Sequence, residues 1–90
     1  NLQTLDLGSN SIGAYGIIAL SKNTTWINLQ TLNLEFNSIG REGAIALSKN
    51  TTWINLQTLN LGYFNLIGAE LVASLKKNQA WSKNVQIISY

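Results

Sequence analysis

Leucines recur with one spacing along the chain, and polar residues separate them. The segment Asn-Leu-Gln-Thr-Leu-Asn-Leu occupies residues 28–34 and 55–61, with one difference at 1–7 and a looser copy at 84–90. Within it, Leu32 and Leu34 flank Asn33, which is the two-residue alternation of a strand with one buried face. The pattern therefore predicts a strand at Leu29–Leu34 and at each equivalent position.

A second, helical pattern follows each predicted strand. A turn carrying Asn10, Asn37 or Asn65 comes first, then Ile-Gly, and then apolar residues spaced for one helix face, such as Leu71, Val72 and Leu75. Lysines and an asparagine end each pattern, which suits a helix C-terminus. The predicted helices are Ala14–Lys22, Arg41–Lys49 and Ala69–Lys77.

Strand, turn, helix and return loop together form a unit that repeats every 27 residues. The first two units differ at six positions only, and the third gains a residue within Gly62-Tyr63-Phe64-Asn65. One unit cannot bury its own leucine face, whereas a stack of units makes a continuous core with parallel strands. We therefore interpret 1–90 as a single domain that divides into three repeats and a terminal strand: 1–27, 28–54, 55–83 and 84–90.

The spacing Leu-x-x-Leu-x-Leu-x-x-Asn-x-Ile-Gly-x-x-Gly-x-x-x-Leu at Leu29–Leu47 resembles the leucine-rich repeat of the ribonuclease-inhibitor type. The resemblance implies an α/β solenoid, a short horseshoe arc with a parallel β-sheet on the concave face and helices on the convex face. It also implies a module that binds proteins, often by covering a partner enzyme's working surface. The nearly identical repeats resemble those of secreted effectors of intracellular bacteria.

Composition narrows the chemistry that the chain can carry. It contains no Cys and no His, so the common nucleophile–base pairs are missing and thiolate or imidazole metal sites are excluded. We expect no catalytic residue, no cofactor and no metal. The net charge is only +2, and four of the five lysines fall at the ends of the predicted helices, away from the concave strand residues. We therefore expect no nucleic-acid binding. The chain has no run of about 18 apolar residues, so we also expect no membrane span.

Three recurring residue types have structural interpretations beside functional ones. The turn asparagines Asn10, Asn37 and Asn65 are expected to point inwards and pair with loop backbone groups. The tryptophans are expected to pack in the core, with an exposed aromatic ladder as the alternative: Trp26, Trp53 and Trp81. Asn-Thr-Thr at Asn23 and Asn50 has the form of a glycosylation acceptor, but it also suits the end of a repeated helix.

Strand alternation sends Thr31, Asn33 and Glu35 to the concave side. The equivalent concave residues in the other units are Thr4, Asp6 and Gly8; Thr58, Asn60 and Gly62; and Ile87 and Ser89. Beside them, at the turn edge, run Ser9, Phe36 and then Tyr63-Phe64. These aromatic residues are either a binding hot spot or the local packing of a bulged turn. Most of the six differences between the first two units fall at these positions or at the exposed helix start. The candidate partner-binding residues are Asp6, Asn33, Glu35, Phe36, Asn60, Tyr63 and Phe64.

Two functional hypotheses remain open. In the first, the chain is a non-catalytic module that binds a partner protein and regulates or inhibits a partner enzyme. In the second, it is a structural segment of a longer solenoid without a site of its own. The outer strands also leave open sheet edges that favour self-association. We expect a cytoplasmic location, which is the host cytosol if the protein is a secreted effector.

Overall fold

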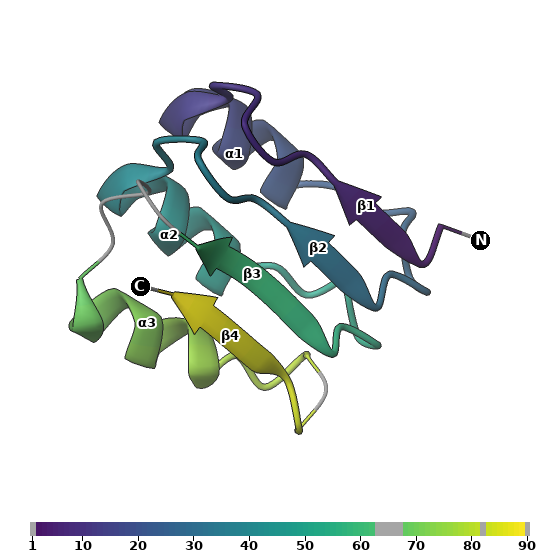
Figure 1. The fold of residues 1–90 in the computed structure, drawn as a ribbon. Helices are drawn as coiled ribbons and strands as arrows, with labels where there is room; N and C mark the ends of the chain where they lie inside the picture. The colour runs from purple at the N-terminus through teal and green to yellow at the C-terminus, as the bar shows by residue number, and fades with distance from the viewer. Residues whose placement is uncertain (1, 63–67, 82, 90) are drawn as a thin grey trace.

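The computed structural model describes residues 2–62, 68–81 and 83–89 of the chain. Three strand-and-helix units follow one another, and a fourth strand comes last (Figure 1). The strands are β1 (Thr4–Asp6), β2 (Thr31–Asn33), β3 (Thr58–Gly62) and β4 (Gln86–Ser89). The helices are α1 (Gly13–Ser21), α2 (Gly40–Ser48) and α3 (Ala69–Lys76). The candidate residues Tyr63 and Phe64 and the turn residue Asn65 lie outside the described residues.

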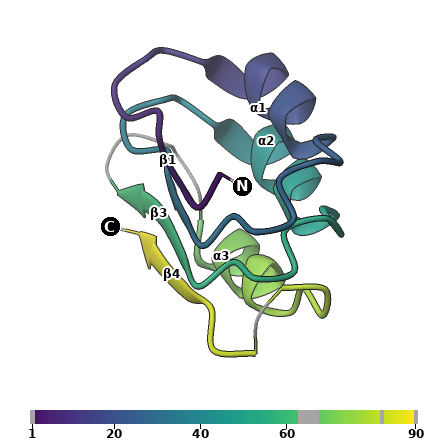
Figure 2. The same cartoon turned by 90° about the vertical axis from the view of Figure 1, so that its right-hand side faces the viewer.

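All neighbouring strands pair in parallel, in the order β1-β2-β3-β4. The three helices lie side by side on one face of this sheet, and the opposite face is open (Figures 1 and 2). Thr4, Thr31 and Thr58 stand in one row across the sheet, and Asp6, Asn33 and Asn60 stand in another. The predicted α/β leucine-rich repeat solenoid with strands on the concave side is therefore confirmed.

β1 and β2 are shorter than the leucine spacing predicted, and each ends at its concave polar residue, Asp6 or Asn33. Asn33 Oδ1 accepts a hydrogen bond from the Glu35 backbone N–H (3.0 Å), and Asp6 Oδ1 accepts one from the Gly8 N–H (2.9 Å). Such side-chain bonds compete with the sheet ladder and favour a turn. Phe36, with a φ of +59°, then bends the chain towards α2.

The helices start and end within one residue of the predicted bounds. Gly13 (φ +73°) and Gly40 (φ +68°) turn the chain into α1 and α2, as expected for turn glycines. Gly16 and Gly43 lie inside the helices. A Cβ atom at Gly43 would fall 2.6 Å from Ile39 Cγ2 and 3.3 Å from Ile17 Cγ2, so its bare surface lets α1 approach α2.

The core lies between the sheet and the helices and consists mainly of the repeated leucines. Leu29, Leu32 and Leu34 are fully buried. Trp53 and Trp81 are buried and stack with ring centroids 6.5 Å apart, and Trp26 is partly buried against the same cluster. The core interpretation of the tryptophans is thus confirmed. Ile17 and Ala44, which occupy equivalent positions in the first two units, are also buried.

Asn37 satisfies the loop backbone of two units at once. Its fully buried amide donates to Leu7 O (2.8 Å) and Glu35 O (3.1 Å). Its Oδ1 accepts from the backbone N–H groups of Asn10 (3.0 Å) and Ile12 (3.2 Å) in the preceding unit. The predicted asparagine ladder is therefore confirmed for this residue, and the unmet backbone groups of the turns have their partners.

A second set of asparagines links the units where the helices end. Asn50 donates to Ser21 O of the preceding unit (3.0 Å), and its Oδ1 accepts from the Thr52 and Trp53 N–H groups and from Trp81 Nε1 (3.2 Å). At 3% exposure, this amide is inaccessible to a glycosyl carrier in the folded chain. The structural interpretation of Asn50 therefore accounts for all of its polar atoms.

The fourth strand differs from the prediction by one residue. Gln86 pairs with Thr58, Ile87 with Leu59 and Ile88 with Asn60. Gln86 and Ile88 therefore stand in line with the concave residues, and Ile87, which was predicted there, packs against the core. The leucine pattern was extended to residues 84–90 in the wrong phase: Thr58 pairs with Gln86, an offset of 28 residues, whereas a fourth unit beginning at residue 84 assumed an offset of 29.

Candidate protein-interaction surface

The concave face presents a band of polar side chains from adjacent strands. Asp6 is exposed, and Asn33 and Asn60, its partners in register, are half-buried. Glu35 follows β2 on the same side and is also half-buried. The structure thus brings four of the predicted site residues onto one face. Because a sheet exposes alternate residues, their side chains are free of the core packing that fixes the leucines.

Glu35 reaches across from the second unit to the third. Its Oε1 accepts a hydrogen bond from Asn60 Nδ2 at 3.2 Å. The side chain also lies over Gly62, where an added Cβ would fall 2.3 Å from Glu35 Cγ. The Oδ1 atom of Asn60 is buried and has no hydrogen-bond partner among the described residues. The glycine therefore makes room for a carboxylate at the centre of the concave band.

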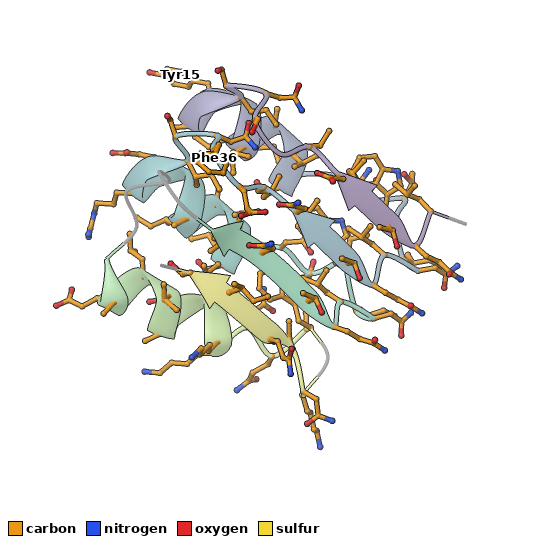
Figure 3. The ribbon with its side chains drawn as sticks, in the orientation of Figure 1. Tyr15 and Phe36 are labelled. Atoms are coloured by element: carbon orange, nitrogen blue, oxygen red, sulfur yellow. The ribbon has the colours of Figure 1, made fainter. Side chains whose placement is uncertain are left out.

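Phe36 lies at the turn edge of this band, directly after Glu35 (Figure 3). Its backbone is left-handed, with a φ of +59°, and the residue is 40% exposed. Ser9 holds the same position in the first unit with a φ of +60°. Bulky residues seldom adopt this conformation, which costs about 1–2 kcal/mol relative to glycine. The backbone conformation of the turn therefore gives no reason for a phenylalanine at this position.

The six differences between the first two units sort by their place in the structure. Asp6/Asn33, Gly8/Glu35 and Ser9/Phe36 lie on the concave face and its turn edge. Tyr15, which is 90% exposed, projects from the start of α1, and Ala14 lies beside it (Figure 3). Five of the six differences are thus outside the core, and only Ile17/Ala44 is within it.

The basic residues lie on the helix side of the molecule, whereas the acidic residues are divided between the strands and the first turns of α2 and α3, which hold Glu42 and Glu70. The acidic residues Asp6 and Glu35 belong to the strand side, whereas Lys22, Lys49 and Lys77 directly follow the helices. Among the described residues, no lysine or arginine lies in a strand. A nucleic-acid groove would require basic residues along the concave face, so this arrangement does not suit one.

Three features of the surface were not anticipated from the residues. The left-handed backbone at Ser9 and Phe36 could not be predicted from the sequence, because neither serine nor phenylalanine favours this conformation. A groove of about 590 Å³ lies between α1 and α2, lined by Ile18, Ile45 and Ala46 among others. The third is Ile88, an apolar residue in the concave row; it was missed because the prediction placed Ile87 on the concave face.

The described part of the chain contains no group of three or more acidic, His or Cys side chains placed to hold a metal ion. Within the same residues, no helix has the length and apolar character needed to cross a bilayer.

Comparison with known proteins agrees with this architecture. The family model described as Leucine Rich repeat matches residues 1–21 and 27–48. No curated protein and no solved structure matches the chain significantly. The family matches support a leucine-rich repeat protein, and the parallel sheet with helices on one of its faces has the fold of an α/β solenoid. Such repeats generally serve as non-catalytic modules that bind proteins.

Proposed function

We propose that this protein binds a partner protein through its concave face and turn edge, with Phe36 as the anchor. The proposed site comprises Asp6, Asn33, Glu35, Phe36 and Asn60, together with Tyr63 and Phe64, which lie outside the described residues. We further propose that the partner is an enzyme, regulated because the arc covers its working surface. The repeat resembles the ribonuclease-inhibitor type, in which this mode of action is common.

The conformation of Phe36 carries the proposal. A large aromatic residue in a left-handed turn is unfavourable for folding, and serine serves at the equivalent position of the same chain. Strain that folding does not require is commonly found where a residue has a binding role. The 40% exposure leaves part of the ring available for burial by a partner. Aromatic anchors with polar surroundings are typical of interface hot spots.

The polar residues beside Phe36 supply the directional contacts. The Glu35 carboxylate and the side chains of Asn33 and Asn60 face the concave side and together offer acceptors and donors. Such groups give an interface its specificity and its orientation more than its affinity. A partner that buries the ring and donates hydrogen bonds to Glu35 would meet both kinds of contact.

The alternative function is that of a structural segment in a longer solenoid. Its support is the partial exposure of apolar residues in the first unit, among them Leu5 and Trp26. This alternative predicts that the concave residues are interchangeable between units without consequence for binding.

The test is a capture experiment with the immobilised chain, followed by mass spectrometry of the bound proteins. Phe36→Ser introduces the residue that already occupies this backbone conformation at Ser9, so the fold is expected to persist. Glu35→Gln keeps the shape and the contact to Asn60 but removes the charge. A protein captured by the parent chain and lost or weakened at least tenfold in these variants supports the site.

A control variant changes the exposed helix start instead. Arg41→Ala with Glu42→Tyr gives the second unit the residues of the first at these positions, with no change in net charge. We expect it to retain the captured protein. Equal capture by Phe36→Ser, Glu35→Gln and the parent chain would contradict the proposed site and favour the structural alternative.

A further inference from the structure

The helices end and the strands begin at the same edge of the molecule (Figures 1 and 2). We call this surface the return-loop edge, because it carries the loops that lead from each helix to the next strand. Within the described residues it comprises 22–30, 49–57, 76–81 and 83–85. It lies opposite the edge where the strands end and the helices start, so it is separate from Phe36 and the proposed partner site.

The charges of the chain are divided between these two edges. Every lysine lies at the return-loop edge and is exposed: Lys22, Lys49, Lys76, Lys77 and Lys83. All four acidic residues lie at the opposite edge: Asp6, Glu35, Glu42 and Glu70. Arg41 is the one basic residue beside them. The return-loop edge is therefore strongly positive although the whole chain has a net charge of only +2.

The helix dipole explains only part of this arrangement. A lysine directly after a helix stabilises the negative helix end, which accounts for Lys22 and Lys49. The third unit exceeds this need, since α3 ends with two lysines and a third lysine follows in the return loop. One hollow of about 650 Å³ beside Trp81 is lined by all three: Lys76, Lys77 and Lys83. Because like charges repel, folding alone does not favour this cluster.

Two apolar side chains stand at the same edge as the lysines. Ile27 and Ile54 are each 52% exposed, whereas the neighbouring Trp53 is fully buried. Ile54 has a unit on either side of it and is as exposed as Ile27, so this exposure belongs to the edge and not to a place in the stack. Asn55 Nδ2 donates to Ile27 O at 2.9 Å, which joins the two loops that carry the isoleucines.

The first two units are identical along this edge. Residues 18–27 and 45–54 have the same sequence, and all six differences between the units lie elsewhere. Core packing does not require the exposed Lys22 and Ile27 or their counterparts Lys49 and Ile54. The chain therefore presents the same combination of a lysine and an exposed isoleucine twice, side by side.

We propose that the return-loop edge docks on an anionic membrane surface. Lysines close to such a surface are attracted by the charge of its headgroups, and exposed apolar side chains enter the boundary between headgroups and acyl chains. Ile27 and Ile54 would take that place, with the five lysines around them. The chain would lie on the bilayer without crossing it. The concave face stays open in this orientation, so the inference does not depend on the proposed partner site.

Other anionic partners fit this edge less well. Single-stranded nucleic acids bind where bases stack on exposed aromatic rings, but Trp53 and Trp81 are buried and Trp26 is partly buried. A duplex contacts lysines through its phosphates and offers no apolar layer to the two isoleucines. An acidic peptide needs its cations gathered in one place, whereas these lysines come from all three units. An extended charged surface with an apolar layer beneath it meets both features.

The test is sedimentation of the full chain with lipid vesicles. One vesicle consists of phosphatidylcholine, and the other contains about one third phosphatidylserine, which supplies the negative charge. We expect binding to the charged vesicle to be at least about tenfold tighter, and we expect it to weaken as salt is added, because salt screens exposed charges.

Two matched variants separate the edge from the net charge. Lys49→Gln and Arg41→Gln each remove one positive charge, at opposite edges of the molecule. Lys49→Gln should weaken binding to the charged vesicle about fivefold, whereas Arg41→Gln should change it by less than about twofold. Equal weakening by the two variants, or equal binding of the parent chain to both vesicles, would overturn the proposal.

The isoleucines are tested by the double variant Ile27→Ser, Ile54→Ser. Both side chains are half exposed, so we expect the melting temperature to stay within a few degrees of the parent value. Binding to the charged vesicle should weaken by about tenfold, because the apolar contact with the bilayer is lost. Unchanged vesicle binding by this folded variant would overturn the proposal. Tighter binding of the parent chain to a DNA duplex than to the charged vesicle would overturn it as well and assign the edge to nucleic acid.

Discussion

The first and second units have nearly the same sequence and very different surroundings. Leu5 is partly exposed at the end of the stack, and Leu32, its partner in register, is fully buried. Asn10 is exposed, and Asn37 is fully buried with hydrogen bonds to two units. Position in the stack, and not residue type, therefore sets how much each side chain contributes to stability.

A second difference between these units runs in the opposite direction. On the concave face the residues themselves differ: Gly8 and Ser9 in the first unit stand where Glu35 and Phe36 stand in the second. The backbone conformation at Ser9 and Phe36 is the same, so the scaffold accepts either residue. The comparison thus separates residues that build the stack from residues that the stack leaves free to vary.

The largest effect is expected from paired leucine truncations. Leu32→Ala should lower the free energy of unfolding by about 2–5 kcal/mol, because it opens a cavity in a closed core. Leu5→Ala should cost less than half as much, since its side chain is already partly in contact with solvent. Urea denaturation of the two variants measures both values. Equal losses would show that position in the stack does not govern stability.

The turn asparagines provide the next comparison. Asn37→Ala should cost about 3 kcal/mol, because it leaves the Leu7 carbonyl and the N–H groups of Asn10 and Ile12 without their buried partner. Asn10→Ala removes only exposed bonds within its own turn and should cost about 1 kcal/mol. Urea denaturation of the two variants measures both losses. A larger loss for Asn10→Ala than for Asn37→Ala would contradict the asparagine ladder between units.

A smaller effect is expected at the glycines of the concave face. Gly62→Ala should cost about 1–2 kcal/mol, since its φ of +40° is unfavourable for alanine and its Cβ would displace Glu35. Gly8→Ala should change stability by less than about 0.5 kcal/mol, because its nearest neighbour is the exposed Asp6 carboxylate at 3.2 Å, and a small shift of that side chain makes room for the methyl group. Thermal unfolding of both variants tests whether Glu35 is held in place by Gly62.

The smallest change in stability is expected at the turn edge. Phe36→Asn should leave the free energy of unfolding within about 0.5 kcal/mol, because asparagine tolerates the left-handed backbone and offsets the lost burial of the ring. Ser9→Asn should stabilise by a few tenths of a kcal/mol for the same reason. A loss above about 2 kcal/mol for Phe36→Asn would mean that the ring is a core residue.

The sequence was sufficient to predict the fold and the helices, because the leucine period and the Lys-Asn helix ends recur in every unit. It could not predict that Leu5 and Leu32 differ in burial, since their local sequences are alike. The early end of β2 depends on the bond from Glu35 N–H to Asn33 Oδ1, which hydrophobic spacing does not report. The phase of β4 depends on how the third unit absorbs one extra residue, which is a matter of tertiary pairing.

The candidate surface was predicted in part. Alternation along the strand placed Asn33 and Glu35 on the concave side, and their half-buried state agrees with this. The left-handed conformation of Phe36 could not be predicted from the sequence pattern, because phenylalanine rarely adopts it. The roles of all these residues in binding stay predictions until a partner is identified.

The most direct test converts the surface of the second unit into that of the first. The triple variant Asn33→Asp, Glu35→Gly and Phe36→Ser has the residues that the first unit already accommodates, with no change in net charge. Its melting temperature and its affinity for the captured partner are measured beside those of the Arg41→Ala, Glu42→Tyr control. We predict a melting temperature within a few degrees of the parent and a loss of binding of at least tenfold. Unchanged affinity in the folded triple variant would contradict the account.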